Sequence, residues 1–362
     1  MGSYKKWRDI TDTEKESIRE EQRRKADELW TRLEEGIREI YESDRYRDYL
    51  DMASKVYQYS ANNQVLILMQ KPEASMVQSM KAWNRMEIRG KEYHRSVNKG
   101  EKGIRILVPL LKTVEMIDKN GNRVLDINGD PVLKKLPYAF KIGNVFDISQ
   151  TNGDELPDIG DFCSVLTGDV PDFEVYREAV EAACPFRVSY DETASEDIKG
   201  YCDHRNCRVV VRPDLSEAQT LKTLIHETAH ARFHDPKDKE DPIRRNDMEI
   251  QAESIAYIVS SHLGLDTSDY SFGYVAGWAS GREIDDLRAN MNAIQEGAEE
   301  LIQGIRDAME LHRELDLVYE ADRPKESAAL PDKPQAQNTL KGFKPAKKPE
   351  KTKPSKKGRD EI

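Results

Sequence analysis

The sequence predicts an α+β protein with two folded units and a disordered tail. Apolar residues recur at helical spacing over roughly the first 80 positions, and glycine-punctuated β-forming segments follow up to about residue 150. A polar, turn-rich stretch around 151–161 then separates these segments from a second run of helices. We expect an N-terminal helix-plus-antiparallel-sheet domain over 1–152, a mainly helical domain over 160–320 and a tail over 323–362.

Composition limits the class of protein. The chain has 362 residues, 38% of them hydrophobic, and a net charge of −11, so it can bury real cores but does not bind nucleic acid through its overall charge. It contains no apolar run of bilayer length and no secretory h-region, and we expect no membrane partner. The four cysteines are few, and we expect reduced thiols in a cytoplasmic protein. They are Cys163, Cys184, Cys202 and Cys207.

The first unit opens with helices. Thr11 and Glu14 form a capping-box pattern, and apolar residues then recur at helical spacing. These residues are Trp30, Leu33, Ile37 and Ile40. Further helices are expected over about 44–59, through "NNQVLILMQ" up to Pro72, and from about Ser75 in "SMVQSMKAW".

Strands follow these helices. "GIRILVPL" is a near-continuous apolar run typical of a buried strand, and "YAFKIGNVFDISQ" predicts another. Between them, "DKNGNRV" and "DINGDPV" each place an Asn-Gly pair between β-forming residues, which predicts hairpin turns.

The second unit contains a strand and three long helices. "RNCRVVVRPD" predicts a strand ending at Pro213, and Ser216 is a candidate N-cap for the helix that contains "TLIHETAHARFH". "NDMEIQAESIAYIVSSHLGL" and the long stretch from "GREIDDL" predict the other two helices. From Arg323 the chain is rich in lysine and proline, which predicts disorder.

His226, Glu227 and His230 form an HExxH pattern within the first of these helices. Residues four apart lie on one helical face, so the two imidazoles can hold one metal ion. The adjacent carboxylate can then act as general base, so that water activated by zinc and Glu227 attacks a peptide bond. We therefore expect a catalytic zinc site, although such a ligand set also accepts manganese or cobalt.

A third ligand is expected from the next helix, where Glu249 and Glu253 are four residues apart. We assign Glu249 as the ligand and Glu253 as the group that accepts a hydrogen bond from a ligand imidazole, with the reverse assignment left open. His234 is interpreted as a cation at the helix C-terminus. The strand "CRVVVR" is expected to pair with a peptide substrate.

The segment 81–112 is basic in an acidic chain, with aromatic residues between the cations. Cations for phosphates and aromatic faces for bases are the ingredients of a single-strand binding groove, although most charge runs are solvated faces. The amides of "SANNQ" add hydrogen-bond donors near a helix start. The candidate DNA-contacting residues are Asn62, Asn63, Gln64, Trp83, Arg95, Lys99, Lys102 and Arg105.

Several of these motifs resemble those of one family in order and spacing. "YSANNQVLILMQKPEASMVQSMKAW", "VNKGEKGIRILVPL", "FKIGNVFDISQT" and "HETAHARFH" are similar to segments of ArdC-like antirestriction proteins, and the last resembles, more distantly, the ImmA/IrrE peptidases. The resemblance implies an N-terminal domain that binds single-stranded DNA and a zincin-like metallopeptidase domain. It also implies carriage on a mobile genetic element.

The resemblance implies the same site roles as the residue pattern. His226, His230 and Glu249 would be metal ligands and Glu227 the general base, but Gln251 stands where relatives often carry an acid. Two alternatives stay open: an ImmA/IrrE-like protease that cleaves a repressor, and a DNA-protecting protein whose zinc site is not proteolytic. The peptide substrate is not predicted.

Overall fold

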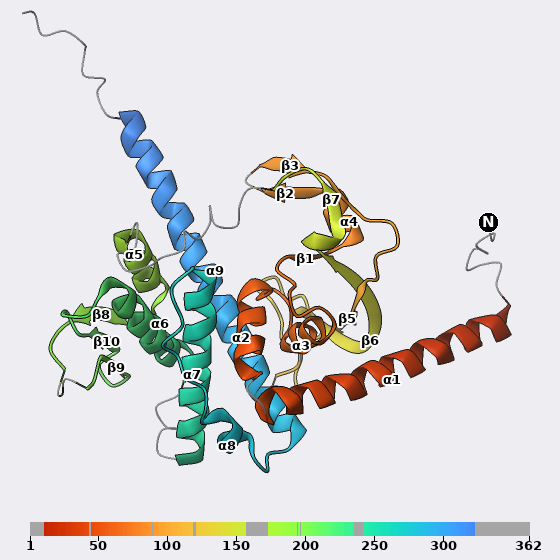
Figure 1. Ribbon diagram of the computed structural model, residues 1–362, viewed down its shortest axis with the longest axis horizontal. Helices are drawn as coiled ribbons and strands as arrows, with labels where there is room; N and C mark the ends of the chain where they lie inside the picture. The colour runs from red at the N-terminus through yellow and green to blue at the C-terminus, as the bar shows by residue number, and fades with distance from the viewer. Residues whose placement is uncertain are drawn as a thin grey trace, which may run out of the picture. The chain divides into compact units, whose positions relative to one another are not determined.

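The protein is seen here as a computed structural model, and Figure 1 shows its elements. The structure describes residues 11–42, 45–88, 90–118, 121–156, 173–193, 195, 197–234 and 242–322. The predicted tail, 323–362, and Cys163 lie outside the described residues. Within them, no disulfide joins Cys184, Cys202 and Cys207 to one another.

Three helices open the chain, α1 (Asp12–Glu42), α2 (Tyr46–Lys55) and α3 (Ala61–Gln70). The predicted capping box is confirmed, because the Glu14 backbone N–H donates to Thr11 Oγ1 at 3.2 Å and the Thr11 N–H donates to Glu14 Oε2 at 2.8 Å. The apolar stripe predicted for α1 faces the core, with Leu33 and Ile37 fully buried.

An antiparallel three-stranded sheet follows, with the order β1 (Val77–Ser79), β6 (Leu133–Asp147), β5 (Ile104–Glu115). The helix expected from Ser75 begins later, as α4 (Met80–Asn84), because Val77–Ser79 pairs with β6 and the Ser79 side chain caps the helix. Short pairs complete the unit: β2 (Met86–Ile88) with β3 (Lys91–Tyr93), and β4 (Arg95–Val97) with β7 (Thr151–Gly153), after the 3₁₀ turn η2 (Ile148–Gln150).

Between β5 and β6 the chain makes the two predicted turns. Gly121 and Gly129, the second residues of the two Asn-Gly pairs, have φ angles of 85° and 86°, which glycine adopts at little cost. The backbone pairs Ile117 with Arg123 and Leu125 with Pro131 across these turns. The result is a long β5–β6 ribbon whose outer part leaves large apolar side chains exposed.

The second unit begins with α5 (Phe173–Ala183) and the sheet β8 (Arg187–Tyr190), β10 (Arg208–Val211), β9 (Gly200–Asp203), in that order. Four helices follow: α6 (Glu217–Phe233), α7 (Pro242–His262), α8 (Val275–Ala279) and α9 (Ile284–Asp322). Ser216 caps α6 as predicted, its hydroxyl accepting from the Gln219 N–H. α6 and α7 pack against each other (Figure 1).

The helices of the first unit share a core with the second. α2 packs against α7, and residues Met1–Leu317 form one compact unit by their contacts. The Tyr46 hydroxyl lies 2.8 Å from Ser254 Oγ, and the Tyr257 hydroxyl donates to Asp51 at 2.6 Å. The predicted boundary between two domains falls partly in 157–172, outside the described residues, and stays a prediction. None of the helices in the described ranges has the length and apolarity needed to cross a membrane.

Candidate metal centre

The helix α6 positions the two histidines of the HExxH pattern. It lies against α7 and the β8–β10–β9 sheet, so most of its surface is buried, including Leu224 and Ile225 between the polar positions. His230 is 4% exposed and Glu227 is 8% exposed. Burial holds these side chains in fixed rotamers, which a coordination site requires.

α7 brings two carboxylates to the same place. Glu249 and Glu253 lie one helical turn apart, and both face the imidazoles of α6. The Oε2 atom of Glu249 lies 3.8 Å from His226 Nε2 and 3.4 Å from His230 Nε2. The two Nε2 atoms are 3.1 Å apart. His226, His230 and Glu249 thus form a group that could hold a metal ion.

These separations match the requirement of a small divalent ion. Ligand atoms about 2.0–2.2 Å from a tetrahedral zinc lie roughly 3.3–3.5 Å from one another. The three distances of 3.1, 3.4 and 3.8 Å bracket that spacing. Two imidazoles and one carboxylate are also donors that zinc and manganese accept. The residues therefore fit a divalent metal.

Glu253 orients the first imidazole. Its Oε2 atom lies 3.1 Å from His226 Nδ1, a position that favours a proton on Nδ1 and leaves the Nε2 lone pair for the site. Burial lowers the pKa of His226, but the hydrogen bond to Glu253 and the nearby carboxylates outweigh it and leave the pKa raised.

His234 orients the second imidazole, and its interpretation as a helix-end cation is wrong. Its Nδ1 atom lies 2.9 Å from His230 Nδ1, and its Nε2 atom lies 3.2 Å from Gln251 Oε1. Burial, with the neighbouring His230, lowers the pKa of His234 to about 4, so the ring is neutral at pH 7. If Gln251 Oε1 accepts from His234 Nε2–H, then His234 Nδ1 accepts from His230 Nδ1–H, and His230 Nε2 points its lone pair at the site.

A cavity of about 360 Å³ opens beside the candidate ligands. His226, Glu227 and Glu253 line it, together with Gly200 of β9 and Tyr270 of the segment after α7. The strand expected to pair with a peptide is not the one at the cavity. β10, which contains that sequence, is the central strand with both edges occupied, whereas β9, which contributes Gly200 to the cavity, is one of the two edge strands.

The structure removes three residues from the candidate DNA-contacting set. Trp83 is fully buried and its indole N–H donates to Phe146 O at 2.9 Å, because it closes the core between α4 and β6. Asn63 is buried and exchanges two hydrogen bonds with the Leu107 backbone. Gln64 is fully buried and accepts from the Tyr49 hydroxyl.

The remaining candidates differ in exposure. Lys99 and Lys102 are exposed, and Arg105 is half-buried on β5. Arg95 ties β4 to β7 by donating to Thr151 Oγ1 at 2.9 Å and to the Thr151 carbonyl, so its guanidinium has a structural role. Asn62 is half-buried, and its Oδ1 atom has no hydrogen-bond partner among the residues that the structure describes.

Sequence reasoning missed the outer β5–β6 ribbon as a surface. Tyr138 is 60% exposed and Phe140 is 44% exposed on β6, although aromatic residues in a strand usually indicate core. Lysines flank them on both strands: Lys112, Lys134, Lys135 and Lys141, all exposed. A signal was present in "LKKLPYAFK", where lysines interrupt the apolar residues.

Comparison with known proteins agrees with this architecture. Residues 19–146 match the family model for the N-terminal domain of the anti-restriction factor ArdC, and residues 184–270 match the IrrE N-terminal-like domain of the M78 peptidases. The chain joins an ArdC N-terminal domain to an IrrE-like domain. The expectation drawn from the resemblance is therefore confirmed at the level of the two families.

Individual relatives match the chain at low identity. An uncharacterized protein of Bacillus anthracis is 27% identical over 337 residues, which is 83% of this chain but 54% of that protein, so the chain spans about half of its relative. The metal-free structure of the antirestriction protein ArdC from plasmid R388 is 22% identical, covering 70% of this chain and 84% of that one, with a TM-score of 0.37. Its Mn(II)-bound structure is 20% identical over the same shares, also with a TM-score of 0.37.

Proposed function

We propose that the chain is an ArdC-type antirestriction protein that binds single-stranded DNA and hydrolyses peptide bonds at a metal site. The observation that carries the peptidase half is the convergence of two imidazole Nε2 atoms and the Glu249 carboxylate beside Glu227. The match to the IrrE-like domain supports it. The match to the ArdC N-terminal domain supports the antirestriction half.

His226, His230 and Glu249 would hold the metal, for which zinc is our proposal. Two histidines and a glutamate are a common ligand set of catalytic zinc and leave a coordination position open. When bound, the ion supplies Lewis-acid chemistry that lowers the pKa of water and polarises a carbonyl. Glu253 and His234 would keep the imidazoles in the required tautomers, since each contacts the Nδ1 atom of one ligand ring.

Glu227 would carry the protons of the reaction. It follows His226 directly on α6 and lines the cavity, so its carboxylate can take a proton from water there and pass it to the leaving amine. The peptide would lie along β9, whose outer edge can pair with an extended chain next to Glu227. Gly200 lets that strand approach α6 closely, because a Cβ atom there would lie 2.7 Å from Thr223 Cγ2 and 2.8 Å from Val210 O.

Single-stranded DNA would lie along the β5–β6 ribbon, from the loop before β5 to the exposed aromatic residues of its outer part. Lys99 and Lys102 are exposed at that loop, and Tyr138 and Phe140 present aromatic surface among the ribbon lysines. Cations attract the phosphates, and exposed rings stack on bases without regard to sequence. Tyr138 and Phe140 take the stacking role that was expected of Trp83.

The experiment that tests the peptidase half uses the full chain and a generic substrate. Purified protein is stripped of metal, reloaded with one equivalent of zinc and mixed with fluorescein-labelled, denatured casein. We expect cleavage by the reloaded protein and none by the stripped protein or by His230→Ala. Absence of cleavage by zinc-loaded wild type would reject the peptidase proposal and leave the DNA-protecting alternative.

We expect the protein to act in the cytoplasm, where incoming DNA meets restriction enzymes.

A further inference from the structure

Residues 263–274, the segment between α7 and α8, form one wall of the cavity. This segment is called the wall below. Asp269 and Tyr270 of this segment line the cavity opposite Thr223 and Gln219 of α6. Burial raises the pKa of the Tyr270 phenol, and the negative charge of nearby Glu253 also raises it. The segment therefore borders both the metal ligands and the space in which a substrate would lie.

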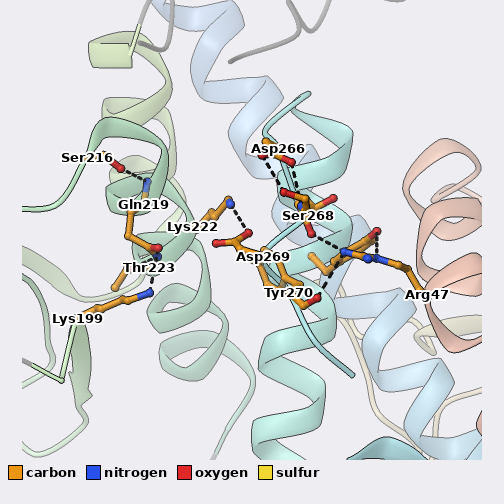
Figure 2. Close-up of polar contacts among 12 residues, drawn as sticks. Arg47, Lys199, Ser216, Gln219, Lys222, Thr223, Asp266, Ser268, Asp269 and Tyr270 are labelled. Atoms are coloured by element: carbon orange, nitrogen blue, oxygen red, sulfur yellow. Dashed lines mark hydrogen bonds and ion pairs between the residues drawn. The ribbon is translucent and has the colours of Figure 1, made fainter. Parts of the chain in front are cut away.

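α6 holds this wall from one side. The Lys222 ammonium lies 2.6 Å from Asp269 Oδ1, and its side chain is only 9% exposed. It also lies 5.5 Å from the centre of the Tyr270 ring. Lys222 is one helical turn before His226, so this ion pair joins the wall to the helix that carries the candidate ligands (Figure 2).

α2 holds the wall from the other side. The Arg47 Nη2 atom donates to Thr267 O at 2.7 Å and lies 3.5 Å from Tyr270 O. The Arg47 Nε atom donates to the Tyr257 hydroxyl at 3.3 Å. Figure 2 shows Arg47 and Lys222 approaching the segment from opposite sides. The ring of Tyr46, the preceding residue, packs against Phe272 with centroids 5.5 Å apart.

The hydrogen bonds within the wall are local, and they include one from the Ser268 hydroxyl to Asp266 Oδ2 at 3.0 Å. Ser268 donates its N–H to Asp266 Oδ1 at 2.9 Å, and the Tyr270 N–H donates to Thr267 O at 3.3 Å. The Arg47 guanidinium adds donors to two carbonyls of the wall, beside the Lys222–Asp269 ion pair and the packing of Tyr270 on Tyr257. Charge-assisted hydrogen bonds of this kind are the strong ones. Arg47 lies within residues 19–146, the part of the chain that matches the ArdC N-terminal domain.

We infer that Arg47 is a positioning residue for the cavity, so that the ArdC N-terminal domain completes the binding site of the IrrE-like domain. Arg47 touches neither the candidate ligands nor Glu227 in the part of the chain that the structure describes. It acts through the backbone of Thr267 and Tyr270, which fixes the positions of Asp269 and the Tyr270 ring. The expected effect of Arg47 on substrate binding rests on the proposed peptidase function. Its expected effect on the order of the wall does not.

The test compares three variants of the full chain. Arg47→Ala removes the donors, Arg47→Lys restores a charge that reaches one carbonyl, and Arg45→Ala is the matched control. Arg45 stands two residues before Arg47, at the N-cap of α2, and its guanidinium lies 2.7 Å from Glu39. Hydrogen–deuterium exchange is measured over residues 264–274, with zinc content and the kinetics of casein cleavage.

For Arg47→Ala we expect exchange about tenfold faster in this segment, from the loss of charge-assisted hydrogen bonds. Exchange in α6 and α7 and the zinc content stay as in wild type. KM for casein rises several-fold while kcat changes little, because the wall binds substrate and does not carry the reacting groups. For Arg47→Lys we expect exchange rates and a KM between those of wild type and Arg47→Ala. Arg45→Ala should behave as wild type.

Unchanged exchange in Arg47→Ala overturns the inference, as does an unchanged KM in a variant whose wall exchanges faster. A fall in kcat with lost zinc shows general damage to the site and also overturns it. If zinc-loaded wild type cleaves no casein, the peptidase proposal fails on its own. The claim that Arg47 orders the wall is then decided by the exchange rates alone.

Discussion

The Nδ1 atom of His234 lies 2.9 Å from the Nδ1 atom of His230, and the far side of the His234 ring reaches Gln251. The two α-helices of the site thus support a ligand imidazole through a second imidazole. A carboxylate is a more common partner for the second nitrogen of a ligand imidazole, and Glu253 has this position beside His226.

Replacing His234 is expected to weaken metal binding without removing a ligand. In His234→Ala the His230 ring loses its partner and samples the wrong tautomer, so zinc affinity should fall about 10- to 100-fold. Competition with a chromogenic chelator measures it. The control is Gln251→Glu, whose carboxylate can still accept from His234 Nε2–H and should keep the affinity within a few-fold of wild type. Equal affinity in His234→Ala and wild type would show that His234 merely packs.

A methyl group at position 200 is expected to disturb the cavity. In Gly200→Ala the new Cβ atom would lie 2.7 Å from Thr223 Cγ2 and 2.8 Å from Val210 O, so β9 must move away from α6. We expect a loss of about 1–3 kcal/mol in the free energy of unfolding and reduced casein cleavage at unchanged zinc content.

Gly277→Ala is the control for this substitution, because nothing lies within 4 Å of its added Cβ atom and alanine is a better helix former in α8. Denaturant unfolding compares the two variants. If Gly200→Ala is as stable as Gly277→Ala, the close approach of β9 to α6 is not a constraint.

Binding to single-stranded DNA is expected to depend on salt through Lys99 and Lys102. Replacing both by alanine should reduce the slope of log K against log salt by about 1.4, two phosphate contacts at roughly 0.7 each. Tyr138→Ala should weaken binding about tenfold or more while leaving that slope unchanged, because stacking releases no counterions. Fluorescence anisotropy with a labelled oligonucleotide measures both. An unchanged slope in the lysine variant would place the phosphates elsewhere.

Asp147 is expected to make the stability of the N-terminal domain depend on acid pH. Burial raises its pKa, but hydrogen bonds from Ser149 and from the backbone N–H groups of Ser75 and Met76 outweigh this and lower the pKa below the ordinary value. A carboxyl with a lowered folded pKa stabilises the fold fully above its unfolded pKa of about 3.9, and the contribution is lost as the pH falls through the folded pKa.

Asp147→Asn should therefore lower the free energy of unfolding by about 1.5–3 kcal/mol at pH 7. The difference from wild type should shrink at acid pH. Urea unfolding at a series of pH values measures it, and a difference that does not change between pH 7 and pH 3 would contradict the assignment.

Spacing along helices was enough to predict the residue pairs of the site, since residues four apart must share a face. This spacing pairs His226 with His230 and Glu249 with Glu253. The packing of α6 on α7, which spacing does not predict, brings Glu249 to the two imidazoles. Their supporting partners were harder to predict, because His234 acts through a ring-to-ring contact that depends on where α6 ends. The long-range contact of Arg47 with Thr267, 220 residues away, has no signature in local sequence.

The exposure of several side chains differs from the prediction, because packing against neighbouring elements determines which side chains are buried. Trp83 lies in a basic, polar segment but fills the core beneath β6, while Tyr138 and Phe140 lie in a strand and remain exposed. The sequence predicts DNA-contacting amides at Asn63 and Gln64, but in the fold these side chains join α3 to β5 and to α2. Amphipathic patterns predict which face of an element is buried only when the neighbouring element is known.

The central claim is that His226, His230 and Glu249 bind a metal at which Glu227 acts as general base. The most direct measurement is the zinc content and the casein cleavage of Glu227→Gln, beside wild type and His230→Ala. We expect about one zinc per chain in wild type and Glu227→Gln, cleavage by wild type alone, and loss of zinc in His230→Ala. Cleavage by Glu227→Gln at the wild-type rate, or zinc retained in full by His230→Ala, would contradict it.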